Sequence, residues 1–513
     1  MNTITKSLIF IGIFLGALVT TLILKKNFKN SELRVAFPAS KSAFNYEPTK
    51  IHLGHEYIFL ENVFSPLVEM DPRDGKIIPG LAKSYEWNGD DLALEIRSDS
   101  KTPSGQTITA DDVEFSLKRL LVLSGNTHGN FKDLVCPNLE LKTIEEKCDG
   151  ITRKGNKIIL KAGKRKSFLI PMLAAIDFAI IPKSSVDLKT LAIKNFKETS
   201  GPYFVDQDSE IGEIILKANP NHYRYSTNIP QLIKLVPVNP SKKSASLELL
   251  IKNEVDHLTT IDQTKPEEIL SLSLTRDDLN IHATHKIRNL SLVFTEKGIK
   301  TFSSSERHQI GLQVRKAFEE ILKTKPIYEK TAEFFSSMAD GGLSKDEKKE
   351  ILNSFLKEPN KIFSKKIKIG ILRSGEILSW TNELKKQMPE SDLYQENNVP
   401  DFKKYESENE IPHAFIASTD TGFMEDINLI SYTLSAGFFG LKKDERQKWL
   451  AYYMENDSKT ERVNKLREIH FKSLNEAYLV PIAVSPFIAV VKKPWKMELS
   501  ELYANNQLWL IKQ

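Results

Sequence analysis

The sequence predicts a mixed α/β protein built from several lobes. The chain has 513 residues, more than one hydrophobic core normally supports, so two or three lobes with separate cores are expected. Predicted strands and helices alternate along the whole length, but their connections vary and show no regular βαβ period of a barrel. With 40% hydrophobic and 27% charged residues, the composition is that of an ordinary globular protein.

Apolar spacing and turn residues place the individual elements. Turns are predicted over 71–75 (DPRDG) and 102–105, because Pro, Asp and Gly favour chain reversal. A helix is predicted to follow Thr109 as its N-cap, with apolar residues at helical spacing behind it. Two more helices are predicted over 306–323 and 459–478. Strands are predicted over 33–37, 92–97, 157–161, 213–217, 232–238 and 367–372.

The balance of charges argues against nucleic acid as a partner. The net charge of +5 is the difference between 72 basic and 67 acidic side chains, which is close to neutral for this length. A nucleic-acid-binding chain would concentrate its basic residues in a stripe. We therefore expect no nucleic-acid partner.

The sequence contains no local motif of catalysis or metal binding. His52, His55 and Glu56 in HLGHE come nearest to a zinc motif, but their order is neither H-E-x-x-H nor H-x-x-E-H, and Gly54 interrupts them. Nucleophile-elbow, P-loop and dinucleotide-binding patterns are missing as well. We expect no catalytic residue, no metal and no cofactor, so the chain is predicted not to be an enzyme. A hydrolase whose site is assembled from distant residues is an alternative.

An uncharged apolar segment lies close to the N-terminus. Residues 7–24 (SLIFIGIFLGALVTTLIL) would span about 27 Å as a helix, close to the hydrocarbon thickness of a bilayer. Lys6 precedes this segment and Lys25-Lys26 follows it, without a small-residue cleavage site. We favour an uncleaved signal anchor with a basic linker, together residues 1–30. A cleaved signal peptide and a buried helix are the alternatives.

Cys136 and Cys148 are the two cysteines of the chain. Their spacing is too wide for a C-x-x-C redox or zinc pair. In an oxidising compartment they would form one disulfide that closes a small loop and stabilises it by about 3 kcal/mol. Two unrelated thiols are the alternative.

Two blocks in the first third of the chain carry a family pattern. They read FLENVFSPLVEMDPRDGKIIPGLAKSYEW over 59–87 and LEIRSDSKTPSGQTITADDVEFSLKRL over 94–120. They resemble the extracytoplasmic solute-binding proteins of family 5, the peptide and nickel class that serves oligopeptide and dipeptide ABC importers. Fainter similarity continues in TSGPY (199–203), ILKANPNHYR (215–224), 247–256, VRKAF (314–318) and 480–484.

The resemblance implies a periplasmic-binding-protein-like α/β fold with two main lobes, a small inserted lobe and a hinge between the main lobes. Lobe I would consist of residues 31–58, 192–285 and 481–513. The inserted lobe would span 59–191, and lobe III would span 286–480. Closure of the main lobes around a ligand would be the working cycle.

The resemblance also implies what the chain does and where. It would capture a peptide or similar small polar solute for an ABC-transporter permease, as a monomer, at the periplasmic or extracytoplasmic face of the cytoplasmic membrane. The lysines after residues 7–24 outnumber those before, which by the positive-inside rule favours the opposite orientation; the resemblance outweighs this. A membrane-tethered sensor or interaction protein that keeps the fold without transport is the alternative.

Five residues are candidates for ligand contact. Tyr46, Tyr57 and Glu61 lie near segments that enter the cleft in the proteins the chain resembles. Peptide binders of this class pair the peptide's amino group with an acidic residue in a late W-x-A-D-Y segment. The corresponding stretch here (418–432) lacks the Trp and has Gly at the gapless position of the Asp. Asp420 or Asp426 would take that role after a small shift.

Overall fold

The computed structural model describes the chain from residue 31 to its last residue, with gaps. No described helix is long and apolar enough to cross a membrane. The predicted membrane segment 7–24 lies outside the described residues. These comprise 31–37, 46–51, 54–71, 75–124, 129–137, 141–163, 166–206, 213–238, 245–259, 266–335, 340–356, 365–372, 377–396, 410–420, 443–456, 458–497 and 507–513.

A seven-stranded mixed sheet forms the first structural unit. β1 (Glu32–Phe37) pairs in parallel with β10 (Leu232–Pro237) and β11 (His257–Thr259), which brings together segments about 200 residues apart. The sheet order is β12-β19-β11-β1-β10-β9-β8. The other strands are β8 (Tyr203–Val205), β9 (Ile214–Ala218), β12 (Leu279–Ala283) and β19 (Ile488–Lys492).

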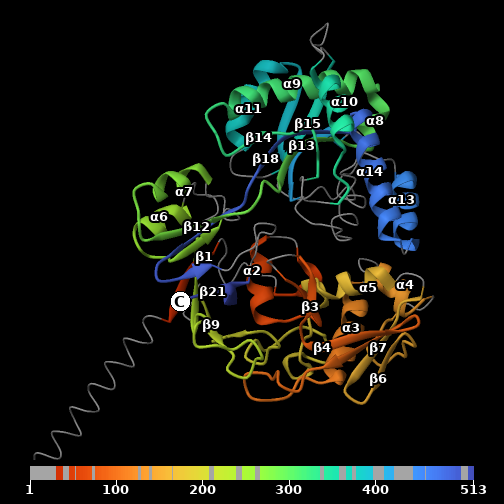
Figure 1. Ribbon diagram of the computed structural model, residues 1–513, viewed down its shortest axis with the longest axis vertical. Helices are drawn as coiled ribbons and strands as arrows, with labels where there is room; N and C mark the ends of the chain where they lie inside the picture. Colours follow the sequence, from red (N-terminus) through yellow and green to blue (C-terminus); the bar gives the residue numbers. More distant parts are fainter. Residues whose placement is uncertain are drawn as a thin grey trace, which may run out of the picture.

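Three helices accompany this sheet (Figure 1). α6 (Ala245–Ile251) and α7 (Pro266–Ser273) share an apolar cluster with β11, β12 and β19. α2 (Gly54–Val63) packs its Ile58, Phe59 and Val63 into a second cluster with β1, β8, β9 and β10. α2 lies on the side of this unit that is turned toward the other half of the molecule.

A four-stranded antiparallel sheet forms the second unit, inserted between α2 and β8. Its order is β4-β5-β7-β6, and α3 (Ala110–Ser124) packs against β6 and β7. The hairpin β2 (Val68–Met70) and β3 (Ile77–Pro79) connects α2 to this sheet. The remaining elements are β4 (Ala82–Asn88), β5 (Asp91–Ile96), β6 (Ile151–Lys154), β7 (Lys157–Lys161), α4 (Gly129–Val135) and α5 (Lys166–Leu173).

A six-stranded mixed sheet forms the third unit, in the order β14-β18-β13-β17-β15-β16. α9 (Ser304–Leu322) begins with a capping box between Ser303 and Glu306 and packs against α10, α11 and β18. The strands are β13 (Arg288–Phe294), β14 (Glu329–Lys330), β15 (Ile367–Leu372), β16 (Ser391–Glu396), β17 (Ala414–Asp420) and β18 (Leu479–Ser485). The other helices are α8 (Glu296–Thr301), α10 (Lys345–Leu356), α11 (Ile377–Gln387), α13 (Lys443–Glu455) and α14 (Lys459–Asn475).

Two adjacent chain segments connect the seven-stranded and six-stranded sheets. One joins β12 to β13 over 284–287 and the other joins β18 to β19 over 486–487. Between them, the Thr284 N–H donates to the Phe487 carbonyl at 3.0 Å, and the Phe487 N–H donates to the Thr284 hydroxyl at 2.8 Å. The crossing is therefore a two-strand ribbon tied by one pair of hydrogen bonds.

The predicted fold class is confirmed by this arrangement of mixed α/β units. The strands predicted over 33–37, 92–97 and 367–372 are β1, β5 and β15, and the helices predicted over 306–323 and 459–478 are α9 and α14, within three residues at each end. The lobe borders remain a prediction. In the structure β18, which begins at Leu479, pairs with β13 in the six-stranded sheet.

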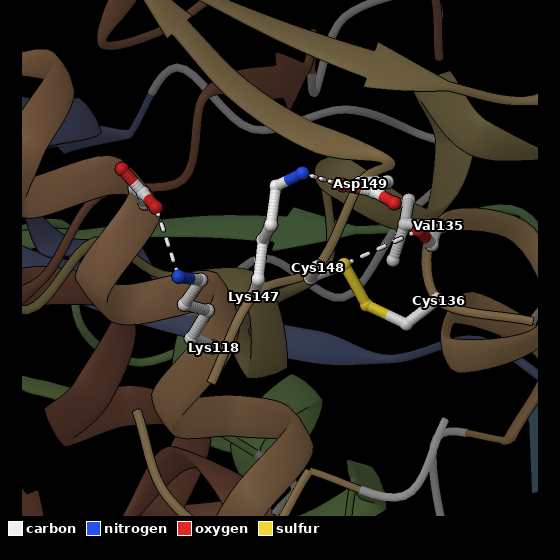
Figure 2. The surroundings of a disulfide bond; sticks show 7 residues. Lys118, Val135, Cys136, Lys147, Cys148 and Asp149 are labelled. Carbon is white, nitrogen blue, oxygen red and sulfur yellow. Dashed lines mark hydrogen bonds and ion pairs between the residues drawn. A yellow bond between two sulfur atoms is a disulfide. The ribbon is translucent and has the colours of Figure 1, made fainter. Parts of the chain in front are cut away.

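The predicted disulfide between Cys136 and Cys148 is present. The two Cα atoms lie 5.4 Å apart, and Cys136 follows the end of α4. Both residues are buried in the core of the inserted sheet, and the Cys148 Sγ lies 3.2 Å from the Val135 carbonyl oxygen (Figure 2). The bond therefore joins α4 to the loop that leads into β6.

Removal of this disulfide should destabilise the inserted sheet. For the Cys136→Ala/Cys148→Ala double variant we expect a loss of about 3 kcal/mol in the free energy of unfolding, because the unfolded chain regains the freedom of the closed loop. Urea unfolding followed by tryptophan fluorescence measures the loss. Thiol labelling of the denatured, unreduced wild type should modify neither cysteine; labelling of both would contradict the bond.

Candidate functional site

The carboxyl ends of the parallel strands in both large sheets point toward the connecting ribbon. In the seven-stranded sheet, Thr259 of β11 lies opposite Ala489, beside the ribbon end of β19. In the six-stranded sheet, Asp420 of β17 lies opposite Arg288, the first residue after the ribbon. Ligands of open α/β sheets bind outside the carboxyl ends of the strands. The carboxyl ends of the parallel strands in the two sheets are Phe37, Pro237, Thr259, Leu372, Glu396 and Asp420.

Backbone contacts fix the segment between α2 and β2 beside this region. The Gly201 N–H donates to the Val63 carbonyl at 3.0 Å, and a Cβ at position 201 would lie 2.4 Å from the Val63 carbonyl carbon. A Cβ at Gly80 would lie 2.8 Å from the Pro66 carbonyl oxygen. Glycine is required at both positions because the backbones approach too closely for any side chain. The PGLA and SGPY motifs thus hold the end of α2.

Polar side chains add to these contacts. Together with PGLA and SGPY they form a clamp around the end of α2. The Ser200 hydroxyl accepts from the Ser65 N–H at 3.0 Å and donates to the Ile180 carbonyl at 2.5 Å. Asn219 donates from its side chain to the Lys101 carbonyl at 2.9 Å, and its N–H donates to the Pro202 carbonyl. The motif blocks that are separate in sequence therefore meet at one corner of the molecule.

A buried ion pair lies at this corner. The carboxylate of Glu69 on β2 accepts from Tyr223 Oη at 2.6 Å and from Arg224 Nη2 at 2.5 Å. The Arg224 guanidinium stacks 4.4 Å from the Trp509 ring, and the Arg97 guanidinium stacks 4.2 Å from the Tyr223 ring. Burial, with the nearby Arg224 and Arg97 charges, holds the pKa of His222 well below its ordinary value, so that its ring is neutral. Both oxygens of Glu69 thus have partners.

Glu61 is a second carboxyl near the first, and it is unpaired. It lies on α2, is partly accessible to solvent, and makes neither a hydrogen bond nor an ion pair with any described residue. The pKa of Glu61 is raised to about 8, chiefly because burial disfavours its charge and further because the Glu69 carboxylate is close. Near neutral pH this carboxyl is therefore mostly protonated.

The two predicted tyrosines pack beside α2. The Tyr46 ring contacts Phe59 at 4.7 Å and Phe196 at 5.1 Å between ring centroids, and burial raises the pKa of Tyr46 to about 12. Tyr57 is half-buried and packs against the same apolar cluster. It lies one helical turn before Glu61, so both residues are on one face of α2. Their role in ligand contact remains a prediction.

The two predicted aspartates belong to the six-stranded sheet and the stretch after it. Asp420 ends β17 at the ribbon side, with its backbone opposite Arg288. Asp426 lies outside the described residues. Arg288, the first residue of β13, stacks its guanidinium 4.5 Å from the Phe487 ring, so a positive side chain packs against the ribbon next to the end of β17. The structure therefore brings Asp420, but not Tyr46 or Glu61, to the six-stranded side of the region.

Sequence reasoning missed two pairs of functional candidates. Glu69 and Arg224 pair across 155 positions, and Thr284 and Phe487 tie the ribbon across 203 positions. NPNHYR indicated a turn before Arg224 but gave no sign of its partner. Among the described residues, no group of three or more His, Cys, Asp or Glu side chains is placed to hold a metal ion.

The comparisons with known proteins agree with this geometry. The profile described as "Bacterial extracellular solute-binding proteins, family 5 Middle" matches residues 76–330. The chain is a family 5 solute-binding protein. Its matched region contains the inserted sheet, the clamp motifs and the first ribbon segment. Comparison with curated protein sequences gives no match.

Solved structures share the fold of this family 5 protein. OppA from Haemophilus influenzae in complex with RPPGFSPFR is 15% identical, with a TM-score of 0.70, covering 94% of this chain and 98% of OppA. NikA from Brucella suis in complex with Fe(III)-EDTA is 15% identical, with a TM-score of 0.71 over 94% and 99%. A periplasmic oligopeptide-binding protein from Borrelia burgdorferi is 16% identical, with a TM-score of 0.71 over 94% and 99%. At such identities the similarity establishes the fold.

The raised pKa of Glu61 predicts a pH dependence of stability. Between about pH 4.5 and 8 the folded chain keeps a proton on Glu61 that the unfolded chain has lost, so stability falls as pH rises through this window. The Glu61 contribution has a slope of at most about 1.4 kcal/mol per pH unit. In Glu61→Gln this contribution should vanish, and the variant should be more stable than the wild type at pH 8. Urea unfolding from pH 5 to 8.5 measures the difference.

Glu69→Gln is the matched control for this prediction. The same Glu-to-Gln substitution at Glu69, on β2, leaves Arg224 without its carboxylate. We expect it to lower the free energy of unfolding by about 3 kcal/mol at neutral pH. The two variants should therefore change stability in opposite directions at pH 8. Equal effects of the two substitutions on stability would contradict the assignment of Glu69 as paired and Glu61 as unpaired.

Proposed function

We propose that this chain captures a peptide or a similar small polar solute between its two large sheets and delivers it to an ABC-importer permease. The observation that carries the proposal is the meeting of the carboxyl ends of parallel strands from both sheets at one two-strand ribbon. A ribbon of this kind allows the sheets to rotate about 284–287 and 486–487 while each stays intact. The peptide bound to OppA supports a peptide as the ligand class.

Ligand identification is the direct test of this proposal. Mass spectrometry of small molecules that co-purify with the chain should reveal a bound peptide or polar solute. Small-angle scattering should then show a smaller radius of gyration with ligand than without, because the sheets close around it. Genes for a permease and an ATPase beside this one would favour transport over a tethered sensor.

Asp420 and Asp426 are proposed as partners of a ligand's amino group. Loss of the partner of a buried ammonium costs about 3–5 kcal/mol. For Asp420→Ala or Asp426→Ala we therefore expect an affinity loss of a few hundredfold or more in one of the two variants. Titration calorimetry with the identified ligand measures it. Unchanged affinity in both single variants and in the double variant would remove the amine contact from this stretch.

We also propose that residues 7–24 anchor the chain at the extracytoplasmic face of the membrane. The linker 25–30 reaches at most about 20 Å, so the start of β1 would stay near the bilayer. Ser31 precedes β1 at the end of the strand opposite to Phe37, so the carboxyl strand ends would lie on the side of the sheet away from the tether.

The anchor is tested by fractionation and N-terminal sequencing. The mature chain should remain in the membrane fraction and keep Met1 or residues close to it. A mature start near residues 25 to 35 would contradict the anchor while leaving export intact. Cytoplasmic activity of a reporter fused to the C-terminus would contradict export itself.

A further inference from the structure

Glu61 and Glu69 are neighbouring carboxyls with unequal surroundings. Glu69 is buried, and both of its oxygens accept hydrogen bonds, from Tyr223 and Arg224. Among the residues that the structure describes, none donates a hydrogen bond to Glu61, which remains partly accessible to solvent. A carboxyl enclosed by protein normally has a donor or a cation beside it, because its charge is costly to bury alone. Since no described residue supplies this donor or cation, a group from outside the chain has room to supply it at the solvent-accessible side of Glu61.

The position of Glu61 suits a ligand contact. It lies on the helix face that also carries Tyr57, and α2 lies on the side of its unit turned toward the six-stranded half (Figure 1). The first turn of the same helix reaches the carboxyl end of β1, where the His55 and Phe37 rings lie 5.9 Å apart. A solute at the strand ends thus has α2 beside it, and a side group about 10 Å long would reach from the first turn to Glu61.

We propose that Glu61 is the contact for a cationic group of the captured solute, an ammonium or a guanidinium, and that the proton held by Glu61 leaves to solvent when this group binds. The inference rests on the proposed capture of a solute and adds the charge of that solute. In the free protein the proton neutralises Glu61. In the complex the cation takes its place, so one positive charge enters and one leaves.

Glu69 cannot take this role, because Arg224 already neutralises it. The same Arg224 is too fully engaged to serve Glu61, since its Nη2 donates to Glu69, its Nε donates to Tyr223 and its face lies on Trp509. This corner therefore holds one carboxylate that is paired with a guanidinium, Glu69 with Arg224, and one carboxyl, Glu61, that can pair with a cation of the solute. The titratable and charged groups on the surrounding elements are His55, Glu56 and Tyr57 on α2, with Tyr46, Glu69, Arg97, Asp177, Tyr203, His222, Tyr223 and Arg224.

The exchange has a measurable pH signature. Because the raised pKa of Glu61 keeps the proton bound below about pH 8, binding of a cation must displace it there. The affinity for a cationic solute should rise about tenfold per pH unit toward pH 8 and level off above it. A neutral solute held by the other contacts should show no such slope.

The test uses the full chain and two peptide probes, trilysine and N-acetyl-trialanine amide. Calorimetry near pH 7 in phosphate and in Tris, whose ionisation enthalpies differ, counts the protons exchanged. We expect close to one proton released per trilysine bound. Glu61→Gln should abolish the release and weaken trilysine binding at least about thirtyfold, since the cation loses its partner. Glu61→Asp should retain part of both effects.

A charge-matched control separates local contact from general electrostatics. Glu213→Gln removes one negative charge from the residue that precedes β9 in the same unit, where Glu213 pairs with Lys234 at 2.8 Å. It should leave proton release and affinity unchanged. Unaltered trilysine affinity and proton release in Glu61→Gln would overturn the assignment of Glu61 and leave the proposed capture standing. Failure of the wild type to bind either peptide would overturn peptide capture and this inference together.

Discussion

The close backbone contact between Gly201 and the end of α2 is the constraint on which the rest of this corner depends. With a Cβ at position 201 only 2.4 Å from the Val63 carbonyl carbon, no other residue fits without displacement of the helix. α2 is thereby held against β8, and Asn62 on its other side accepts from the Leu508 N–H at 2.8 Å. The chain before β2 and the C-terminal turn are consequently fixed by one helix. Side chains on the face of α2 that carries Tyr57 and Glu61 keep a defined position relative to the strand ends.

The polar core at this corner combines a complete ion pair, Glu69 with Arg224, with a carboxyl, Glu61, that has no partner among the described residues. Removal of either Arg224 or Glu69 leaves the other charge without its partner, which destabilises the fold. The pair therefore supports stability only while both members are present. Glu61 introduces the opposite condition, a carboxyl without a partner, which costs stability unless it is protonated. Strain or unpaired groups of this kind occur where a ligand completes the structure. The complete pair holds the corner rigid, so the unpaired group stays in place.

Local patterns predicted the elements of this fold well, and long-range pairings of side chains poorly. The capping box at Ser303 and Glu306 can be read from four residues, and β15 was placed from its apolar run alone. The Cys136–Cys148 bond followed from two cysteines close in sequence. The ion pair of Glu69 with Arg224 and the ribbon bond of Thr284 with Phe487 join residues 155 and 203 positions apart. No spacing rule predicts such partners, because the fold has to bring them together first.

The same distinction explains why the family was recognisable and the ligand was not. PGLA and SGPY are shared because the positions they occupy admit almost no alternative: a backbone oxygen or carbon of another segment occupies the place of the side chain. Contacts with a solute carry no such steric requirement, and each can change when the solute changes. Glu61 lies between these two cases. The packing of α2 requires neither its charge nor its length. We therefore propose that its place in a motif block reflects what it binds rather than how the block folds.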